Sequence, residues 1–379
     1  MKLIHLSDLH LGKRVNELSM LEDQKYILLE ILRIIDQEQP DGVLIAGDVY
    51  DKSVPSAEAV ALLDDFLVRL SQRDLQVFII SGNHDSPERI AFGGRLMERS
   101  GVHLAPVYDG VVTPIQLTDE HGPLNIYLLP FIKPAHVRRV FPEREINSYT
   151  DALSVAIEAM EIDSSVRNVL VTHQFVTGAS RCDSEEVSVG GADNVDSSVF
   201  DSFDYVALGH LHGPQQVDRE TVRYCGTPLK YSFSEAGHKK SLTVVEFGPK
   251  GNIDLRTVPL TPMRDMVELR GTYEELTLRQ FYEGSGYRES YIHITLTDED
   301  DIPDAMRKLQ IIYPCLMKLD YDNRRTRVGG QIDEAESIRQ QTPLELLDKF
   351  YERQNGQAMG ESQREFAKEL MEEIWEGEA

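Results

Sequence analysis

Cysteine is scarce in this sequence, and its placement excludes several kinds of site. Only three cysteines occur among 379 residues, namely Cys182, Cys225 and Cys315. None of them belongs to a Cys-x-x-Cys pair, which is the spacing typical of structural zinc sites and dithiol redox centres. An odd number of widely separated cysteines fits reduced thiols, so we expect a cytoplasmic protein.

Long apolar runs are missing as well. No stretch of about 18 apolar residues is available to cross a bilayer. Asp8 and His10 interrupt the only apolar opening, so we expect no signal peptide in this stretch. Internal repeats and low-complexity tracts are absent from the sequence, and 41% of its residues are hydrophobic. We therefore expect a folded protein with no membrane partner, and its length predicts two or more domains.

Positively charged residues are outnumbered. The chain has 39 Lys and Arg against 64 Asp and Glu, which gives a formal net charge of -25. Such a charge repels nucleic acids at long range, because non-specific binding depends on clustered Lys and Arg that neutralise phosphates. The isolated chain should therefore bind nucleic acids weakly.

Residues of metal-ligand type, by contrast, follow short apolar runs throughout the first 212 positions. They are Asp8, His10, Asp48, Asn83, His173, His210 and His212. The apolar runs before them are residues 2–6, 43–46, 77–80, 169–171 and 205–208. Such runs are typical of buried parallel strands, whose carboxyl ends share one edge of an α/β sheet. We therefore expect these side chains to meet at one place.

The chemistry of this set indicates two metal ions. Carboxylate, amide and imidazole ligands together suit first-row transition metals better than magnesium or calcium alone. The set is too large for one ion and suits two ions that share a bridging carboxylate. Two ions roughly 3.5 to 4 Å apart can clamp the attacking and leaving oxygens of a displacement at phosphorus. One such motif alone is weak, but the five in this order favour phosphoester hydrolysis.

A family resemblance rests on the order of these motifs. Asp-x-His, Gly-Asp-x-x-Asp, Gly-Asn-His-Asp, His and Gly-His-x-His resemble the calcineurin-like metallophosphoesterases, and all five are complete. The strings MKLIHLSDLHLGKR, GDVYDKSVPS, GNHDSPERI, GHLHGPQ and YCGTPLKYSFSE are similar to the SbcD family of nuclease subunits. The resemblance covers residues 1–260 closely and the remainder loosely. It implies an α/β/β/α sandwich of four layers, a small α+β capping domain and a C-terminal helical hairpin.

The resemblance also implies a role for each site residue. It implies that one metal ion is held by Asp8, His10 and His212. The other would be held by Asn83, His173 and His210, and Asp48 would bridge the two ions. His84 would face the substrate as general acid for the leaving oxygen or as a hydrogen-bond donor to the phosphate, and Asp51 would orient it. Histidine readily exchanges a proton at neutral pH. Lys52 and Ser53 stand where protein phosphatases have Arg-Gly, which argues against a phosphoprotein phosphatase.

The resemblance implies a DNA nuclease that uses two divalent metal ions, most often manganese. It would be a double-strand 3′–5′ exonuclease and a single-strand or hairpin endonuclease. Its partners would be DNA and SbcC, an SMC-like coiled-coil ATPase, in a heterotetramer built on a homodimer for DNA end processing and repair. Two alternatives stay open. The first is a small-molecule phosphodiesterase or phosphomonoesterase on the same fold, which would not need the C-terminal hairpin. The second is a non-catalytic scaffold, although such proteins usually lose metal ligands and none is missing in this sequence.

Four segments are expected along the chain. They are a phosphoesterase domain at 1–261, a capping domain at 262–327, a linker at 328–342 and a helical tail at 343–379. Capping boxes at residues 342–345 and 362–365 predict two tail helices. Phe366, Leu370 and Ile374 form an apolar stripe on the second helix. The stripe could pack on its own domain, but the resemblance favours docking onto the coiled coil of the ATPase.

Overall fold

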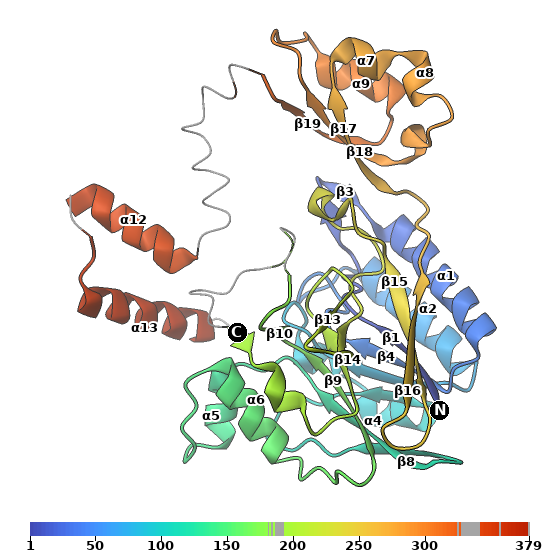
Figure 1. Ribbon diagram of the computed structural model, residues 1–379, viewed down its shortest axis with the longest axis vertical. Coiled ribbons are helices and arrows are strands. Elements are labelled where there is room, and N and C mark those ends of the chain that lie inside the picture. Colours follow the sequence, from blue (N-terminus) through green and yellow to red (C-terminus); the bar gives the residue numbers. More distant parts are fainter. Residues whose placement is uncertain are drawn as a thin grey trace.

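Two six-stranded sheets form the centre of the computed structural model (Figure 1). The structure describes residues 1–180, 182, 185, 193–323, 326, 342–355 and 358–377. In order across the first sheet the strands are β16 (Ile253–Pro259), β15 (Ser241–Phe247), β1 (Lys2–Leu6), β4 (Gly42–Ala46), β5 (Gln76–Ile80) and β6 (Val102–Leu104). The second sheet contains β13 (Gln215–Val217), β14 (Arg219–Tyr224), β12 (Tyr205–Gly209), β9 (Arg167–His173), β8 (Gly122–Leu129) and β7 (Ile115–Asp119).

The central strands of both sheets run parallel. In the first sheet β1, β4, β5 and β6 pair in parallel, and in the second β8, β9, β12 and β14 do. Their apolar sequences are explained by burial on both faces, since every residue of β4, β9 and β12 is buried. The sheets pack face to face through side chains such as Leu44 and Phe78 from the first and Ile126 and Tyr205 from the second, all at 0% exposure.

Helices cover the outer face of each sheet. α1 (Leu21–Glu38) and α2 (Ala57–Ser71) pack on the first sheet, and α5 (Pro134–Val140) and α6 (Tyr149–Glu158) pack on the second. The predicted four-layer α/β/β/α sandwich is therefore confirmed. The apolar spacing of residues 21–35 and 57–70 predicts amphipathic helices, and α1 and α2 confirm this prediction. No such prediction was made for α5 or α6, although the Ser148 and Asp151 capping box of α6 was a usable signal.

A smaller unit, called here the cap, follows the sandwich. Its three-stranded parallel sheet is β17 (Met266–Gly271), β18 (Tyr291–Leu296) and β19 (Leu316–Tyr321), and its helices are α7 (Tyr273–Thr277), α8 (Arg279–Tyr282) and α9 (Ala305–Ile312). It has a core of its own, which includes Leu276 and Ile294. The cap is joined to α1, because Asp23 accepts hydrogen bonds from Tyr291 Oη at 2.6 Å and from Arg264 Nη1 at 2.9 Å.

The tail consists of α12 (Pro343–Asn355) and α13 (Glu361–Gly377), which contact each other through an ion pair of Arg364 with Asp348 at 2.8 Å. The first predicted capping box is confirmed by reciprocal hydrogen bonds between Thr342 and Glu345. The second is wrong, because α13 already begins at Glu361 and the Gln363 side chain accepts from Gly360 N. The linker expected at 328–342 lies, except for its last residue, outside the described residues, as does the side chain of Ile374.

Short elements fill the connections. They are β2 (Arg14–Val15), β3 (Leu18–Ser19), α3 (Pro87–Ile90), α4 (Gly94–Met97), η1 (Glu98–Ser100), β10 (Phe175–Val176), β11 (Asn194–Val195), η3 (Ser197–Phe200), η4 (Phe233–Glu235) and η5 (Tyr287–Glu289). Among the described helices, none combines the length and the hydropathy that a membrane crossing requires.

Candidate metal centre

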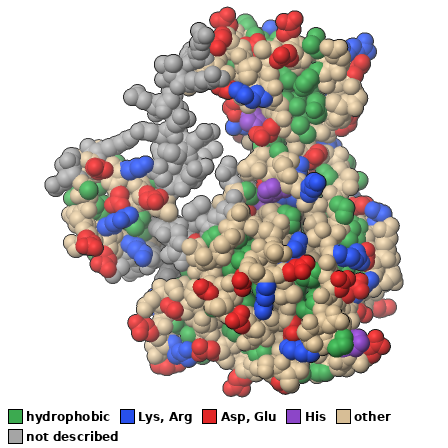
Figure 2. Space-filling view, viewed as in Figure 1, with side chains coloured by type: hydrophobic (Ala, Val, Ile, Leu, Met, Phe, Trp, Pro, Cys, Tyr) green, Lys and Arg blue, Asp and Glu red, His purple; other side chains and the backbone are tan. Residues whose placement is uncertain are grey.

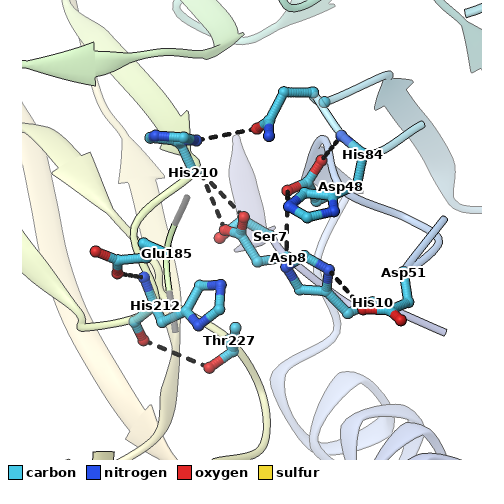
Figure 3. A network of polar contacts seen from close by, with 12 residues as sticks. Ser7, Asp8, His10, Asp48, Asp51, His84, Glu185, His210, His212 and Thr227 are labelled. Carbon is cyan, nitrogen blue, oxygen red and sulfur yellow. Dashed lines mark hydrogen bonds and ion pairs between the residues drawn. The ribbon is translucent and has the colours of Figure 1, made fainter. Parts of the chain in front are cut away.

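All seven predicted ligands lie at the carboxyl ends of central strands. Asp8 and His10 follow β1, Asp48 follows β4, Asn83 follows β5, His173 ends β9, and His210 and His212 follow β12. The structure brings them together from both sheets, and Figure 3 shows Asp8, His10, Asp48 and His210 grouped in this way. The parallel arrangement of the strands explains this convergence.

The backbone at these positions is unusual. Asp8, His10, Asp48 and His210 have positive φ angles of 52°, 44°, 46° and 109°. Residues other than glycine rarely adopt this conformation unless neighbouring contacts hold it. Here the contacts are hydrogen bonds from Asp8 N to Gly47 O at 3.1 Å, from His10 N to Asp48 O at 2.9 Å and from His210 N to Asp8 Oδ1 at 3.0 Å. The loops therefore fix one another at the place where the side chains meet.

Two glycines of the motifs permit this close approach. A Cβ atom at Gly82 would lie 2.1 Å from Asp48 Oδ1, and one at Gly209 would lie 1.8 Å from Ala46 O. Both distances are far below van der Waals contact. The loops that carry Asn83 and His210 can therefore reach the loop of Asp48 only because these two residues have no side chain.

Asn83, His173 and His210 form one group. Asn83 Oδ1 accepts hydrogen bonds from His173 Nε2 at 2.9 Å and His210 Nδ1 at 3.0 Å. His173 Nδ1 donates to Ala46 O at 2.9 Å, which orients the ring. Burial alone would lower the pKa of His173, but the charges of Asp48 and Asp8 raise it to about 9. A metal ion could therefore replace the proton on His173 Nε2.

His10 lies beside Asp48 in the other half of the site. Its ring is fully buried, and in the described part of the chain neither ring nitrogen has a hydrogen-bond partner. Burial holds the pKa of His10 well below its ordinary value, although Asp48 opposes the shift. Asp48 Oδ2 lies 3.6 Å from His10 Nε2 and 3.4 Å from His173 Nε2, between the two groups. A neutral imidazole with an unsatisfied lone pair next to a carboxylate is suited to bind metal.

The remaining ligand, His212, is held on several sides. Its backbone N donates to Glu185 Oε1 at 2.6 Å, and its Nδ1 lies 3.2 Å from Glu235 Oε1 (Figure 3 shows the first contact). Burial opposes protonation, but hydrogen bonds with Cys182 and Glu235 raise the pKa of His212 to about 10. Sequence reasoning missed Glu185 and Glu235. Only the string YSFSE hinted at Glu235, and no spacing connects it to His212.

The donor set fits divalent cations. Ligand atoms of Asp8, Asp48 and His173 lie within 4.8 Å of one another, and all three side chains are buried. Burial, with the Asp48 charge adding to it, raises the pKa of Asp8 to about 6. Two buried carboxylates this close favour a cation between them. Two divalent ions held there would stabilise negative charge on a phosphate and activate a water molecule as the nucleophile.

Comparison with known sequences decides the family. Residues 1–214, more than half of the chain, match the profile described as calcineurin-like phosphoesterase. The chain belongs to this family. The membership that the motifs predicted is thereby confirmed, and this phosphoesterase is a metal-dependent phosphodiester hydrolase that uses divalent cations. Residues 262–355 match a second profile, SbcD_C, described as Type 5 capsule protein repressor C-terminal domain.

One full-length relative agrees with this assignment, and two solved structures show a weaker similarity. The phosphoesterase is 32% identical over 387 aligned residues to a Staphylococcus epidermidis protein named as the D subunit of the nuclease SbcCD, and the alignment covers 100% of both chains. The predicted resemblance to SbcD proteins is thereby confirmed. A solved dimetal phosphatase from Danio rerio has a TM-score of 0.41 and 11% identity, and the match covers 69% of this chain and 98% of that one. A solved Thermus thermophilus protein has a TM-score of 0.39 and 12% identity, and the match covers 68% of this chain and 98% of that one.

His84 occupies the open side of the site in this phosphoesterase. Its backbone N donates to Asp48 Oδ1 at 2.9 Å, while its side chain is 20% exposed, against 3% or less for those of His10, His173 and His212. Asp48 Oδ2 lies 3.9 Å from its Nε2 and is the carboxylate nearest to the ring among the described residues. A partly exposed ring at the edge of the site can reach a bound substrate.

Asp51 lies elsewhere than its predicted role requires. Its carboxylate pairs with Lys13 Nζ at 2.7 Å and lies 3.8 Å from His10 Nδ1. Among the described residues it makes no ion pair with His84. The orientation of His84 by Asp51 therefore stays a prediction without a direct contact to support it.

Asp85, which ends the Gly-Asn-His-Asp motif, connects two of the loops. Its carboxylate accepts hydrogen bonds from the backbone N atoms of Gly82 at 2.9 Å, Val49 at 3.0 Å and Tyr50 at 2.9 Å. Burial, with the Asp48 charge adding to it, raises the pKa of Asp85 to about 6. The sequence placed Asp85 in a motif without giving it a role. The structure indicates that it holds the loop of Asp48 against the loop of Asn83 and His84.

Proposed function

We propose that this phosphoesterase is a two-metal DNA nuclease that works with a coiled-coil ATPase of the SbcC type. The observation that carries the proposal is a complete set of ligand-type side chains, gathered from both sheets, in a chain that aligns over its whole length with a nuclease subunit. The specific activities proposed are double-strand 3′–5′ exonuclease and single-strand or hairpin endonuclease, in DNA end processing.

The proposed ligand assignment follows the position of each side chain. Asp8, His10 and His212 hold one ion, Asn83, His173 and His210 hold the other, and Asp48 bridges them. In support of the bridge, Asp48 belongs to two groups of close ligand atoms, one with His10 and His84 and one with Asp8 and His173. Manganese is the proposed metal, as the resemblance to SbcD-type nucleases implies. The mixture of carboxylate, amide and imidazole suits first-row transition metals as a class.

The surface charge is consistent with a dependence on partners. Figure 2 shows acidic and basic side chains intermixed on its visible face, without a continuous basic stripe among the residues described there. At a net charge of -25, the chain gains little long-range attraction for DNA. We therefore propose that the ATPase and a second copy of this chain supply most of the DNA affinity.

The test of the function is cleavage of linear duplex and hairpin DNA, labelled at the 5′ end, with manganese and with or without the ATPase. Shortening from the 3′ end and opening of the hairpin would support the proposal. Hydrolysis of a chromogenic phosphodiester without cleavage of DNA would favour the small-molecule alternative. A chain that binds two ions and hydrolyses neither substrate would be a scaffold.

The tail supports the proposed ATPase contact through its exposed apolar side chains. Phe350, Phe366 and Leu370 are 61%, 65% and 43% exposed. A helix that packs on its own domain usually buries its apolar face. These side chains therefore offer an apolar surface to another helix, as amphipathic helices do when they dock.

Removal of residues 343–379 should abolish ATP-dependent processing of DNA ends and leave manganese-dependent cleavage of simple substrates intact. None of the proposed ligands lies in the tail, so metal binding and the sandwich should not change. The measurements are cleavage with and without the ATPase and the metal content of the truncated chain. Loss of metal on truncation would contradict this separation of roles.

A milder variant distinguishes docking from internal packing. Phe366→Asp with Leu370→Asp places two charges in the proposed interface, at a cost of several kcal/mol. Ile311→Asp on α9 is the matched control, because this apolar side chain is also exposed, at 75%. Capture of the ATPase should be lost only in the tail variant. Unchanged capture together with a lower melting temperature would mean that the tail packs on its own chain.

We also propose a homodimer, and the structure changes the residues that would form it. From the sequence we expected Val60, Leu63 and Leu67 of α2 to be shared between the sandwich and a twofold contact. Leu63 is buried in the sandwich at 9% exposure, while Val60 is 45% exposed, so only part of this set remains for a twofold contact. Phe92, between α3 and α4, and Leu96 of α4 are more exposed, at 82% and 80%. These side chains are better candidates for the dimer contact.

The double variant Phe92→Glu with Leu96→Glu should be a monomer in light scattering, because charge at an apolar contact opposes association. The unmodified chain should be a dimer at micromolar concentration. A monomeric unmodified chain would count against the proposed dimer, and a dimeric double variant would place the contact elsewhere.

A further inference from the structure

A buried ion pair lies directly behind the proposed ligand His212. The side chains of Glu235 and Lys240 are 0% and 4% exposed, and their charged atoms are 2.5 Å apart. Buried ion pairs of this kind seldom add stability, because removing both charges from water costs about as much as their attraction returns. Their presence is better explained by orientation of a neighbouring group. The group that they contact is His212.

Both oxygens of the Glu235 carboxylate have partners. Oε1 lies 3.2 Å from His212 Nδ1 and accepts from Tyr231 N at 3.3 Å. Oε2 accepts from Lys240 Nζ at 2.5 Å and Thr227 Oγ1 at 3.3 Å. A carboxylate held at four points cannot rotate away. It therefore keeps a proton on His212 Nδ1, which leaves Nε2 as the nitrogen available to an ion.

The same residues also hold the backbone of His212. Lys240 Nζ donates to His212 O at 2.9 Å, and Thr227 N donates to the same oxygen at 3.2 Å (Figure 3 shows Thr227 beside His212). The position of the residue and the rotation of its ring are therefore set by one cluster. Such a cluster acts on the geometry of the ligand, whereas an ordinary core contact would act only on the stability of the fold.

The turn that carries Glu235 is supported from its other side by the cap. Phe233 of η4 packs against the ring of His293 in β18, with 5.3 Å between ring centroids. His293 is itself held by Glu268 at 3.0 Å and Asp320 at 2.8 Å on the two neighbouring strands. The short helix η4 is thus fixed between the cap sheet and the site, so Glu235 keeps a defined place.

From these contacts we infer that Glu235 is a positioning residue for one of the two metal ions, which it affects through His212. The inference rests on the proposed assignment of His212 as a ligand. Hydrogen-bonded partners of a ligating histidine typically change metal affinity by about 10- to 100-fold when they are removed. Glu235→Ala should therefore weaken one of two manganese sites by about this factor and leave the other unchanged.

Manganese titration of the full chain, followed by calorimetry and by electron paramagnetic resonance, tests the inference. The spin-coupled signal of a manganese pair should form in the unmodified chain and require more manganese in Glu235→Ala. Glu235→Gln should lie between the two, because its amide oxygen can still accept from His212 Nδ1. The control is Asp119→Asn, which disturbs another, partly buried ion pair, that with Arg167 at 2.6 Å, at the opposite end of β9 from His173. It should lower the melting temperature of the metal-free chain without changing either affinity.

Three outcomes would test whether Glu235 positions His212 for metal binding. Unchanged affinity at both sites in Glu235→Ala overturns the inference. If that variant does not fold, Glu235→Gln decides alone, and equal affinity at both of its sites likewise overturns it. An unmodified chain that binds two ions but does not cleave DNA refutes the proposed nuclease function and leaves the role of Glu235 standing.

Discussion

Asp48→Ala should lose both tightly bound metal ions and all measurable strand scission. Asp48 Oδ2 lies between the two ligand groups, 3.6 Å from His10 Nε2 and 3.4 Å from His173 Nε2, so this carboxylate can serve both proposed ions from one place. Removal of a bridging ligand acts on both ions together. Metal content by mass spectrometry and cleavage of duplex DNA are the two measurements.

The matched control for this variant is Asp23→Ala. The Asp23 side chain is 1% exposed and pairs with Arg264, but it lies at the contact of α1 with the cap. It should destabilise the chain without removing metal. Tight binding of two ions by Asp48→Ala would show that the bridging role is wrong.

His84→Ala and His84→Gln should keep two metal ions per chain while strand scission falls by about 10²- to 10⁴-fold, the range typical of a lost general acid. The reason is the orientation of the residue. His84 contacts Asp48 through its backbone N, and its ring is the partly exposed one at the open side of the site. Single-turnover cleavage together with metal analysis measures both effects.

The result is informative because His84 also belongs to a group of close ligand atoms with His10 and Asp48. If either variant lost a metal ion, His84 would be a ligand and the proposed role would be refuted. Asp51→Asn is a useful companion. Since Asp51 pairs with Lys13, we expect a smaller loss of rate than for His84→Ala, and no loss at all would remove Asp51 from the catalytic machinery.

Sequence reasoning was most effective where local pattern and topology agree. Apolar runs that end in a polar residue predicted parallel strands, and parallel strands necessarily bring their carboxyl ends together. Positions as distant as Asp8 and Asn83 in the first sheet, or His173 and His212 in the second, could therefore be placed at one sheet edge from the amino-acid sequence alone. The capping box at Thr342 succeeded for a similar reason, since its hydrogen bonds depend only on residues three apart.

Features that depend on tertiary packing were not predictable in this way. Glu235 contacts His212 through a short 3₁₀ helix, and a single turn gives no periodic signal. The sequence did not show which apolar side chains of α2 would be covered, because Val60 and Leu63 are equally apolar and only the sheet beneath decides this. The Lys13 partner of Asp51 likewise follows from the fold of a loop and not from a motif.

The division of the site between the two sheets has a consequence for folding thermodynamics. The first sheet supplies Asp8, His10, Asp48 and Asn83, and the second supplies His173, His210 and His212. In the proposed assignment each ion takes ligands from both sheets, so tight binding of the two ions would require the sheets to have docked. By mass action, ions at 100 times their dissociation constant add about 2.7 kcal/mol per site to the free energy of unfolding. Under this assignment the cation concentration around the chain would add to the apolar core in holding the two halves of the sandwich together.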